Sequence, residues 1–244
     1  MSDNYWDTPC EAWHSTAEVG SHLWSHEITA HRYFVQPHIP EFADFRRWKG
    51  KRVLEIGCGI GTDTMQFERY GAEVHAVESS KISLSIAGKR MKDRENTWLY
   101  RRNAEEFLPT GSFDLVYSFG VLHHTTYPES ILSKARCRMK QDAELRIMLY
   151  AKWSIKHLLG IQPEAKPGCP LVRWYSAREA KRLLESCGFK VVSIRKTHIF
   201  PWRIRDYKEH RFVKVWIWRI MPEKLFSWLE SKLGHHLLIV ARRS

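Results

Sequence analysis

Glu55-Ile56-Gly57-Cys58-Gly59-Ile60-Gly61-Thr62 is the stretch that decides the fold of this chain. It overlaps Arg52-Val53-Leu54-Glu55-Ile56, a nearly continuous apolar run of the kind found in parallel strands covered on both faces. Apolar residues at Met65, Phe67 and Tyr70 then predict a helix. A glycine-rich turn between strand and helix exposes backbone N–H groups at the helix N-terminus and lets a ligand approach the main chain closely. The stretch therefore predicts a ligand site.

A carboxylate lies at the end of the second predicted strand, 73–77. This residue, Glu78, comes 21 residues after Gly57, a position from which a carboxylate accepts hydrogen bonds from ribose hydroxyls. A dinucleotide site of the Gly-x-Gly-x-x-Gly type needs glycine at position 62, where this chain has Thr62. The spacing here is Glu-x-Gly-x-Gly-x-Gly, which differs from that pattern.

From Lys51 onward the chain alternates short β-branched runs with amphipathic stretches, which is typical of an α/β fold with a parallel sheet. We expect further strands at 97–101, 113–118, 144–150, 190–194 and 237–241, and further helices at 82–91, 130–139, 176–186 and 222–233.

Two segments interrupt this alternation, 1–48 and 199–234. In the first, Phe42, Phe45 and Trp48 recur at helical spacing and predict one buried face. The second is rich in aromatic residues and lies between the last two strands, where a turn of a few residues would suffice. Both are interpreted as caps over a ligand site; the alternative is extra core over the sheet edge. The expected organisation is a single domain made of a helical cap segment at 1–48, a core at 49–198, a basic aromatic cap insertion at 199–234 and a last core strand at 235–244.

Composition limits the class of protein. The 244 residues carry 39 Lys and Arg against 27 Asp and Glu, a net charge of +12, and residues 195–244 hold 12 basic against 4 acidic residues. A basic, aromatic end suits an anionic small molecule, nucleic acid, an anionic membrane surface or simply a solvated face. No apolar run approaches the roughly 18 residues of a membrane-spanning helix, and the five cysteines form no Cys-x-x-Cys pair. We expect a cytoplasmic protein.

The glycine turn and Glu78 together resemble the class I S-adenosylmethionine (SAM)-dependent methyltransferases, from about Lys51 to Ala151. The resemblance implies a Rossmann-like α/β sheet of seven mostly parallel strands with the last strand antiparallel. It implies SAM as cofactor and S-adenosylhomocysteine (SAH) as product. Glu55 and the turn would hold the methionine moiety, and Glu78 the ribose. The implied cofactor-binding residues are Glu55, Gly57, Cys58, Gly59, Gly61, Thr62, Glu78, Ser79, Asn103, Ala104 and Ser118.

Other parts of the resemblance narrow the acceptor. Asn103-Ala104 would flank the adenine, although the family usually has an acidic residue in place of Asn103. Ser118-Phe119-Gly120-Val121-Leu122-His123-His124 resembles the Leu-His-His variant of small-molecule methyltransferases of ubiquinone and menaquinone biosynthesis. It contains neither the Pro-Pro tetrad of adenine and cytosine amino-methyltransferases nor the acidic metal cluster of catechol-type enzymes. We therefore expect a small-molecule acceptor and no metal. The usual Lys-Pro-Gly-Gly turn is replaced by Lys140-Gln141-Asp142-Ala143, expected as a loop.

Candidate catalytic residues are His123 and His124, because the motif places both near the methyl donor and histidine accepts protons near neutral pH. The alternative is that one packs against the cap and the other bonds to the backbone. Many of the other histidines are expected at the surface, without the spacing of metal ligands. The predicted substrate-binding residues are Tyr33, His38, Tyr150 and Arg203.

The sequence thus predicts a SAM-dependent methyltransferase that acts on a small anionic or amphipathic metabolite. One alternative is a membrane-surface enzyme for a lipid-like acceptor, with Trp202, Trp216, Trp218 and Trp228 in the interface. Another is an RNA methyltransferase, although nucleic acid is the less expected partner. A third alternative is a SAM-binding subunit without catalysis. Such proteins usually lack part of the donor site, whereas this chain has Glu55, the glycines of the turn and Glu78. Oligomeric state stays open.

Overall fold

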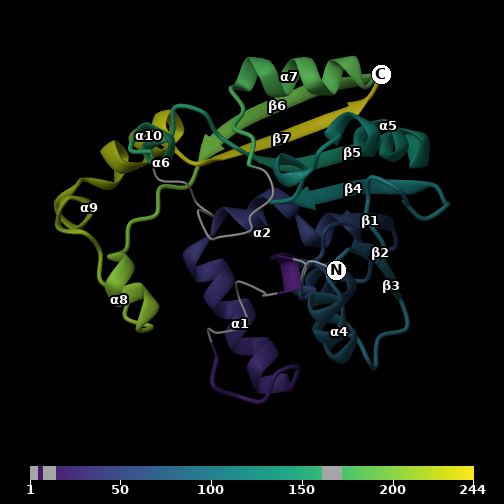
Figure 1. Cartoon of the computed structure of the whole chain (residues 1–244), viewed down its shortest axis with the longest axis horizontal. Helices are drawn as coiled ribbons and strands as arrows, with labels where there is room; N and C mark the ends of the chain where they lie inside the picture. Colours follow the sequence, from purple (N-terminus) through teal and green to yellow (C-terminus); the bar gives the residue numbers. More distant parts are fainter. Residues whose placement is uncertain (1–4, 8–14, 161–171) are drawn as a thin grey trace.

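Seven strands form a single sheet in the order β3-β2-β1-β4-β5-β7-β6, flanked by helices (Figure 1). The structure is a computed structural model that describes residues 5–7, 15–160 and 172–244. Strands β1 to β5 pair in parallel, whereas β7 runs antiparallel to both β5 and β6. This confirms the predicted Rossmann-like sheet with its antiparallel last strand.

The predicted strands and the helices of the core are all present. The strands are β1 (Arg52–Ile56), β2 (Glu73–Glu78), β3 (Thr97–Arg101), β4 (Phe113–Phe119), β5 (Met139–Tyr150), β6 (Phe189–Thr197) and β7 (His236–Arg243). The helices are α1 (His22–Val35), α2 (His38–Ala43), α3 (Thr62–Arg69), α4 (Lys81–Arg90), α5 (Pro128–Arg138), α6 (Ile155–Leu158), α7 (Ala177–Ser186), α8 (Ile204–Lys208), α9 (Trp216–Ile220) and α10 (Glu223–Leu233). Short 3₁₀ turns are η1 (Tyr5–Asp7), η3 (Phe45–Trp48) and η4 (Leu122–His124).

The centre of the sheet is buried on both faces, because neighbouring residues of β1 enter different apolar clusters. Leu54 belongs to the cluster that includes residues of α5 and α7, and Val53 to the cluster formed with α2, η3 and α3. In the second cluster Phe67 is fully buried, with ring centroids 4.7 Å from Phe45 and 5.2 Å from Tyr117. This packing fixes the segment before β1 on the sheet.

Phe42, Phe45 and Trp48 are buried as predicted, although they do not lie on one helix. Asp44 has a left-handed conformation with φ of 51° and separates α2 from η3. All three aromatic side chains are nevertheless buried. The left-handed residue changes the direction of the chain while the apolar spacing still reaches the core.

The prediction of a loop at 140–143 is wrong, because these residues belong to β5. β5 begins at Met139, which pairs with Phe113, and the register shifts between Phe113 and Leu115. The irregularity lets polar residues that lack strand periodicity, such as the exposed Gln141 and Asp142, extend the strand.

The segment between β6 and β7 contains the helices α8, α9 and α10, and it contacts α1. Phe34 of α1 stacks on Trp202 with ring centroids 5.5 Å apart and meets Phe212 edge-on at 4.9 Å. The ring centroids of His31 and Tyr207 lie 5.7 Å apart. The described parts of the two predicted cap segments therefore contact one another; residues 1–4 and 8–14 of the first lie outside the described residues. That they cap a ligand site stays a prediction. No helix in the described ranges is long and apolar enough to cross a membrane.

Candidate functional site

The glycine-rich turn joins β1 to α3 through left-handed backbone. Gly57, Gly59 and Gly61 have φ of 76°, 54° and 78°. A Cβ on Gly57 would collide with the side chain of Val121, whereas one on Gly59 would meet no atom within 4 Å. The turn therefore depends on glycine for its shape, and at Gly59 it leaves space next to the main chain.

Glu78 fixes this turn against the end of β2. Its carboxylate accepts the N–H of Gly59 at 2.9 Å and the N–H of Ser80 at 2.8 Å. The Ser79 hydroxyl donates to the same carboxylate at 3.4 Å. A carboxylate offers about four acceptor positions, so Glu78 retains capacity for a ligand hydroxyl.

Glu55 is buried at the end of β1, where it accepts a 2.5 Å hydrogen bond from the Thr64 hydroxyl. Burial, together with the nearby carboxylate of Asp63, raises the pKa of Glu55 to about 8. The side chain therefore holds a proton at neutral pH until a cation approaches it.

Asp63, in the first turn of α3, organises the contacts of α1 with the sheet. It accepts hydrogen bonds from Arg32 at 3.1 and 3.3 Å, from the Tyr33 hydroxyl at 2.9 Å and from the Tyr117 hydroxyl at 3.0 Å. Sequence reasoning missed Asp63; an acidic residue directly after the glycine turn, in the first turn of a helix, was the available signal. Tyr33, predicted to bind substrate, lies with this acid. The Arg32 guanidinium lies 5.7 Å from the centroid of the Phe119 ring.

The remaining predicted cofactor-binding residues surround the same end of the sheet. The Ser118 hydroxyl donates to the Ile56 carbonyl at 3.0 Å and ties β4 to β1. Thr62 accepts a hydrogen bond of 2.9 Å from the buried Arg90. Cys58 is buried, and burial raises the pKa of its thiol well above the ordinary value. After β3, Asn103 is exposed and accepts the N–H of Glu105 at 2.9 Å, and Ala104 is half-buried.

A second group of side chains lies where β4, β5 and β6 end and β7 begins. We call it the histidine cluster, and its members are the buried residues His38, His123, His124, His198, His235 and His236 with the half-buried Tyr150. Nε2 of His38 is 2.9 Å from Nδ1 of His236. The Tyr150 ring lies between His123 and His235, with centroid distances of 3.7 and 4.2 Å.

Five histidines of the cluster, His38, His123, His198, His235 and His236, are uncharged at neutral pH. Burial lowers the pKa of His38 to about 4 and that of His235 to about 2. Burial likewise lowers the pKa values of His123, His198 and His236 well below the ordinary range. These five residues therefore present neutral, polarisable rings to whatever binds beside them.

Two of the four predicted substrate-binding residues, His38 and Tyr150, belong to this cluster. Arg203 does not: its side chain is exposed at the N-terminus of α8. The sequence analysis, which expected many of the other histidines at the surface, did not identify three members of the cluster, His198, His235 and His236. Strand register brings them together, because Thr197 at the end of β6 pairs with His236 at the start of β7.

The turn η1 contacts both groups. The Asp7 carboxylate accepts a 2.7 Å hydrogen bond from the Ser80 hydroxyl, two residues after Glu78. This bond lowers the pKa of Asp7 below its ordinary value. The Trp6 ring lies edge-on to His124 with centroids 4.9 Å apart. A line of contacts therefore runs from the end of β2 to the histidine cluster.

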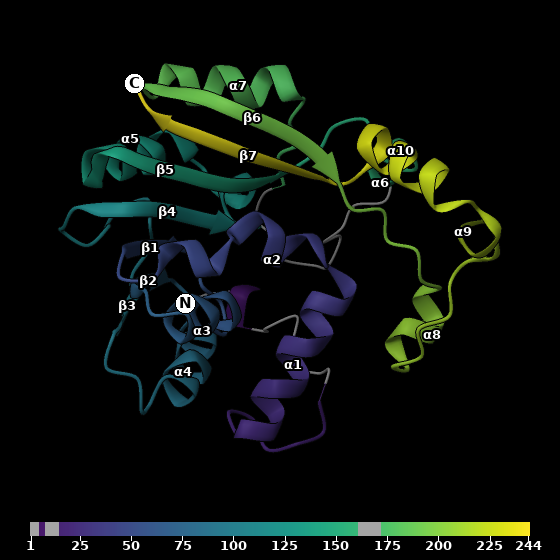
Figure 2. The same cartoon turned by 180° about the vertical axis from the view of Figure 1, so that it is seen from behind.

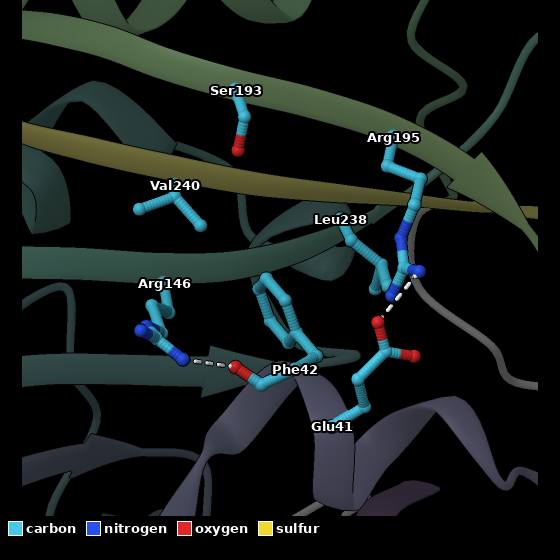
Figure 3. Close-up of a pocket in the computed structure, with 7 residues that line it drawn as sticks. All are labelled: Glu41, Phe42, Arg146, Ser193, Arg195, Leu238 and Val240. Carbon is cyan, nitrogen blue, oxygen red and sulfur yellow. Dashed lines mark hydrogen bonds and ion pairs between the residues drawn. The ribbon is translucent and has the colours of Figure 1, made fainter. Parts of the chain in front are cut away.

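A separate hollow of about 170 Å³ lies beside α2 on the face of β5, β7 and β6 (Figure 3). Arg195 and Glu41 face each other across it with an ion pair of 2.9 Å, and Arg146 donates to the Phe42 carbonyl at 2.6 Å. Its cations are paired, and none of its lining residues belongs to the glycine turn or to the histidine cluster. Among the described residues, no three His, Cys, Asp or Glu side chains are grouped as metal ligands.

Comparison with known proteins gives a consistent family. Residues 24–194 match the model of the methyltransferase domain family. A ubiquinone biosynthesis O-methyltransferase of Nitrosococcus oceani is 33% identical over 87 residues, which are 34% of this chain and 37% of that protein. A tRNA U34 carboxymethyltransferase of Photorhabdus laumondii is 27% identical over 165 residues, 66% of this chain and 49% of that protein. The chain thus matches less than half the length of these curated relatives.

The fold has counterparts of known structure. Magnesium protoporphyrin IX methyltransferase of Synechocystis, solved with bound SAH, superposes with a TM-score of 0.59 at 15% identity, covering 95% of this chain and 90% of that chain. The family model spans well over half of the chain, and the seven-stranded sheet with its antiparallel last strand is the one that the resemblance implies. This chain therefore belongs to the class I SAM-dependent methyltransferase family.

Proposed function

We propose that this protein transfers the methyl group of SAM to a small amphipathic or anionic acceptor bound beside the histidine cluster. The observation that carries the proposal is the junction between the two groups of residues. Gly57 of the glycine turn packs so closely on Val121 that no Cβ fits between them, and η4 with His123 and His124 follows Val121 directly. A donor held by the turn would therefore present its methyl group next to those histidines.

We call the glycine turn together with Glu55, Asp63 and Glu78 the donor side. These residues and their neighbours fit the chemical groups of SAM. Glu78 would accept hydrogen bonds from the ribose hydroxyls with the capacity that its two backbone contacts leave. The buried, protonated Glu55 would ionise beside the methionine ammonium, and Arg32 of α1 would offer a cation for the methionine carboxylate. Asn103 and Ala104, which follow β3, would border the adenine.

The donor supplies a methyl group already activated on a positively charged sulfonium. The protein must mainly align the acceptor atom with that methyl group and exclude water. Neutral rings of Tyr150 and the histidines suit this task, because aromatic faces attract a cation whereas protonated imidazoles would repel it. His124, at the edge of the cluster next to Trp6, is the proposed base for an acceptor that carries a proton.

A small acceptor is favoured over RNA because the cluster is buried among rings from distant segments of the chain. One relative is named for ubiquinone biosynthesis and another for tRNA, so the names of the relatives do not decide between a small-molecule acceptor and RNA. An RNA acceptor would need its target base to reach these buried rings.

Calorimetric titration with SAM and SAH tests the donor site. We expect wild type and the exposed control Glu95→Ala to bind both compounds, and Glu78→Ala to bind on the order of 100-fold more weakly, because two hydrogen bonds to a charged group are lost. Absence of binding to wild type would overturn the proposal.

Methyl transfer from radiolabelled SAM then tests the acceptor class. Small phenols and carboxylates with apolar tails are compared with bulk tRNA. We expect label in the small molecules, and a loss of rate in His124→Gln for the phenols with little change for the carboxylates, which need no base. Label in tRNA alone would contradict the proposed acceptor.

A further inference from the structure

The segment 199–234, which we call the arm, extends away from the end of the sheet in both views (Figures 1 and 2). Its base is anchored: the Ile199 N–H donates to the Glu230 carboxylate at 3.2 Å, and Nζ of Lys196 donates to the Lys232 carbonyl at 3.0 Å. Beyond this base the arm exposes large apolar side chains. They are Ile204, Phe212, Val213, Trp216, Ile217, Ile220, Leu225 and Trp228, with exposed fractions between 37 and 70%.

The exposure of α9 and α10 follows from how the two helices are joined. Trp218 of α9 and Phe226 of α10 are half-buried and meet edge-on with ring centroids 5.7 Å apart. With Trp218 turned inward, Trp216 and Ile220 share the opposite side of α9 and are 64 and 70% exposed. Folding of the arm therefore does not bury them.

The outer side of α10 is apolar as well. Leu225 and Trp228, three residues apart, are 46 and 56% exposed, whereas Phe226, Leu229 and Leu233 on the other side are half-buried. Single exposed apolar residues are ordinary, but a group of this size marks a contact surface.

Basic residues accompany these apolar side chains. Arg219 lies between Trp216 and Ile220 on α9, and Lys224 precedes Leu225 on α10; both are exposed. Asp206 of α8 and Glu209 directly after it both pair with Arg211, at 2.8 and 2.7 Å. Glu223 of α10 is exposed, but the arm as a whole holds eight Lys and Arg against four Asp and Glu. Its surface is therefore apolar and carries a net positive charge.

We propose that the outer side of α9 and α10 docks on an anionic membrane surface. Tryptophan and isoleucine enter the boundary between lipid headgroups and acyl chains, while neighbouring Arg and Lys contact anionic headgroups. Nucleic acid would leave Ile217, Ile220 and Leu225 without a use, and a second copy of this face would bring like charges together across the symmetry axis. The proposal stands apart from the proposed function, since it requires neither SAM nor an acceptor.

Co-sedimentation with vesicles tests the docking surface. The vesicles are phosphatidylcholine alone, or phosphatidylcholine mixed equally with phosphatidylglycerol. We expect the wild-type protein to bind the mixed vesicles at low salt, to bind them less as salt rises, and to bind phosphatidylcholine weakly. Trp216→Ser combined with Ile220→Ser should weaken binding on the order of 100-fold, because two exposed apolar anchors are lost.

Two further variants separate the arm from the rest of the protein surface and its apolar anchors from its charge. Val192→Ser removes a residue that is 57% exposed on β6, outside the arm, and should leave vesicle binding unchanged. Arg219→Gln should weaken binding about fivefold and reduce its salt dependence. Circular dichroism checks that each variant is folded.

Three outcomes would overturn the proposal. The first is wild-type protein that stays in the supernatant with the mixed vesicles. The second is equal vesicle binding by wild type and the double variant. The third is a dimer in sedimentation velocity, or a shifted RNA band, that the double variant abolishes while vesicle binding is unaffected; the arm would then be the surface for that partner instead.

Discussion

The donor side of the sheet and the histidine cluster are held together in different ways. At the donor side, Glu78 and Asp63 accept hydrogen bonds of 2.8 to 3.4 Å from backbone, hydroxyl and guanidinium groups. In the histidine cluster, stacked rings such as Tyr150 on His123 and His198 on His236 make most of the contacts. The hydrogen bonds of Glu78 and Asp63 depend on charge. The ring contacts of the histidine cluster depend on neutral rings. Acid and single substitutions should therefore affect the two groups differently.

Acid should break the histidine cluster with the largest effect. Unfolded histidines gain a proton near pH 6.5, whereas burial keeps His38 neutral down to about pH 4 and His235 down to about pH 2. The unfolded state therefore binds more protons as pH falls below 6.5, and the free energy of unfolding decreases by about 2 kcal/mol per buried histidine between pH 7 and pH 5. Urea denaturation across this range should show the decrease.

A variant identifies the cluster as the cause. His236→Asn removes one such histidine and should lower the dependence of the free energy of unfolding on pH by about 1.4 kcal/mol per pH unit. His26→Gln, at an exposed position on α1, should leave it unchanged. An unchanged slope in His236→Asn would show that the acid sensitivity arises elsewhere.

Asp63→Asn should weaken the donor side by an intermediate amount. The amide accepts fewer hydrogen bonds than a carboxylate and removes the negative charge that balances the Arg32 guanidinium, which is only 16% exposed. We expect the free energy of unfolding to fall by about 2 to 4 kcal/mol in urea denaturation, and SAM affinity to fall with it. Asp93→Asn, exposed in the turn after α4, is the control. A loss below about half a kcal/mol would mean that α1 is held by apolar packing alone.

Two glycines of the same turn sharpen the comparison between stability and binding. Gly57→Ala places a Cβ against Val121 and should cost about 2 to 3 kcal/mol in the free energy of unfolding. Gly59→Ala meets no neighbour and should cost only about 1 kcal/mol for its positive φ, yet it fills the space beside the main chain. Thermal denaturation and SAM titration should therefore rank the two variants in opposite orders. Equal ranking in both would contradict a ligand at Gly59.

The smallest expected effect is a proton count. Because burial raises the pKa of Glu55 to about 8, the folded protein holds a proton that the unfolded chain loses near pH 4.5, and stability falls as pH rises through that window. If the SAM ammonium pairs with Glu55, binding at pH 7 releases up to about one proton. Calorimetry in two buffers of different ionisation enthalpy measures it, and Glu55→Gln should abolish the release. Identical heats in both buffers for wild type would exclude this pairing.

The same contrast explains what the sequence predicted. Glu55, the glycine turn and Glu78 follow one another along β1 and β2, so local pattern was enough to place them. The strands were placed for the same reason, except where β5 gained an irregular start. The histidine cluster draws on α2, η4 and the ends of β6 and β7, and only strand register shows that these segments meet. Asp63 was missed because its partners on α1 lie some 30 residues earlier.

The place of β7 in the sheet has a consequence for synthesis on the ribosome. β6 reaches the sheet through its pairing with β7, and β7 is made after β6 and the arm. While β7 is still inside the exit tunnel, β1 to β5 can already pair, but β6 has no neighbour and His198 has no His236 to stack on. During translation the donor side can therefore form before the histidine cluster, which is complete only when residues 236–243 emerge.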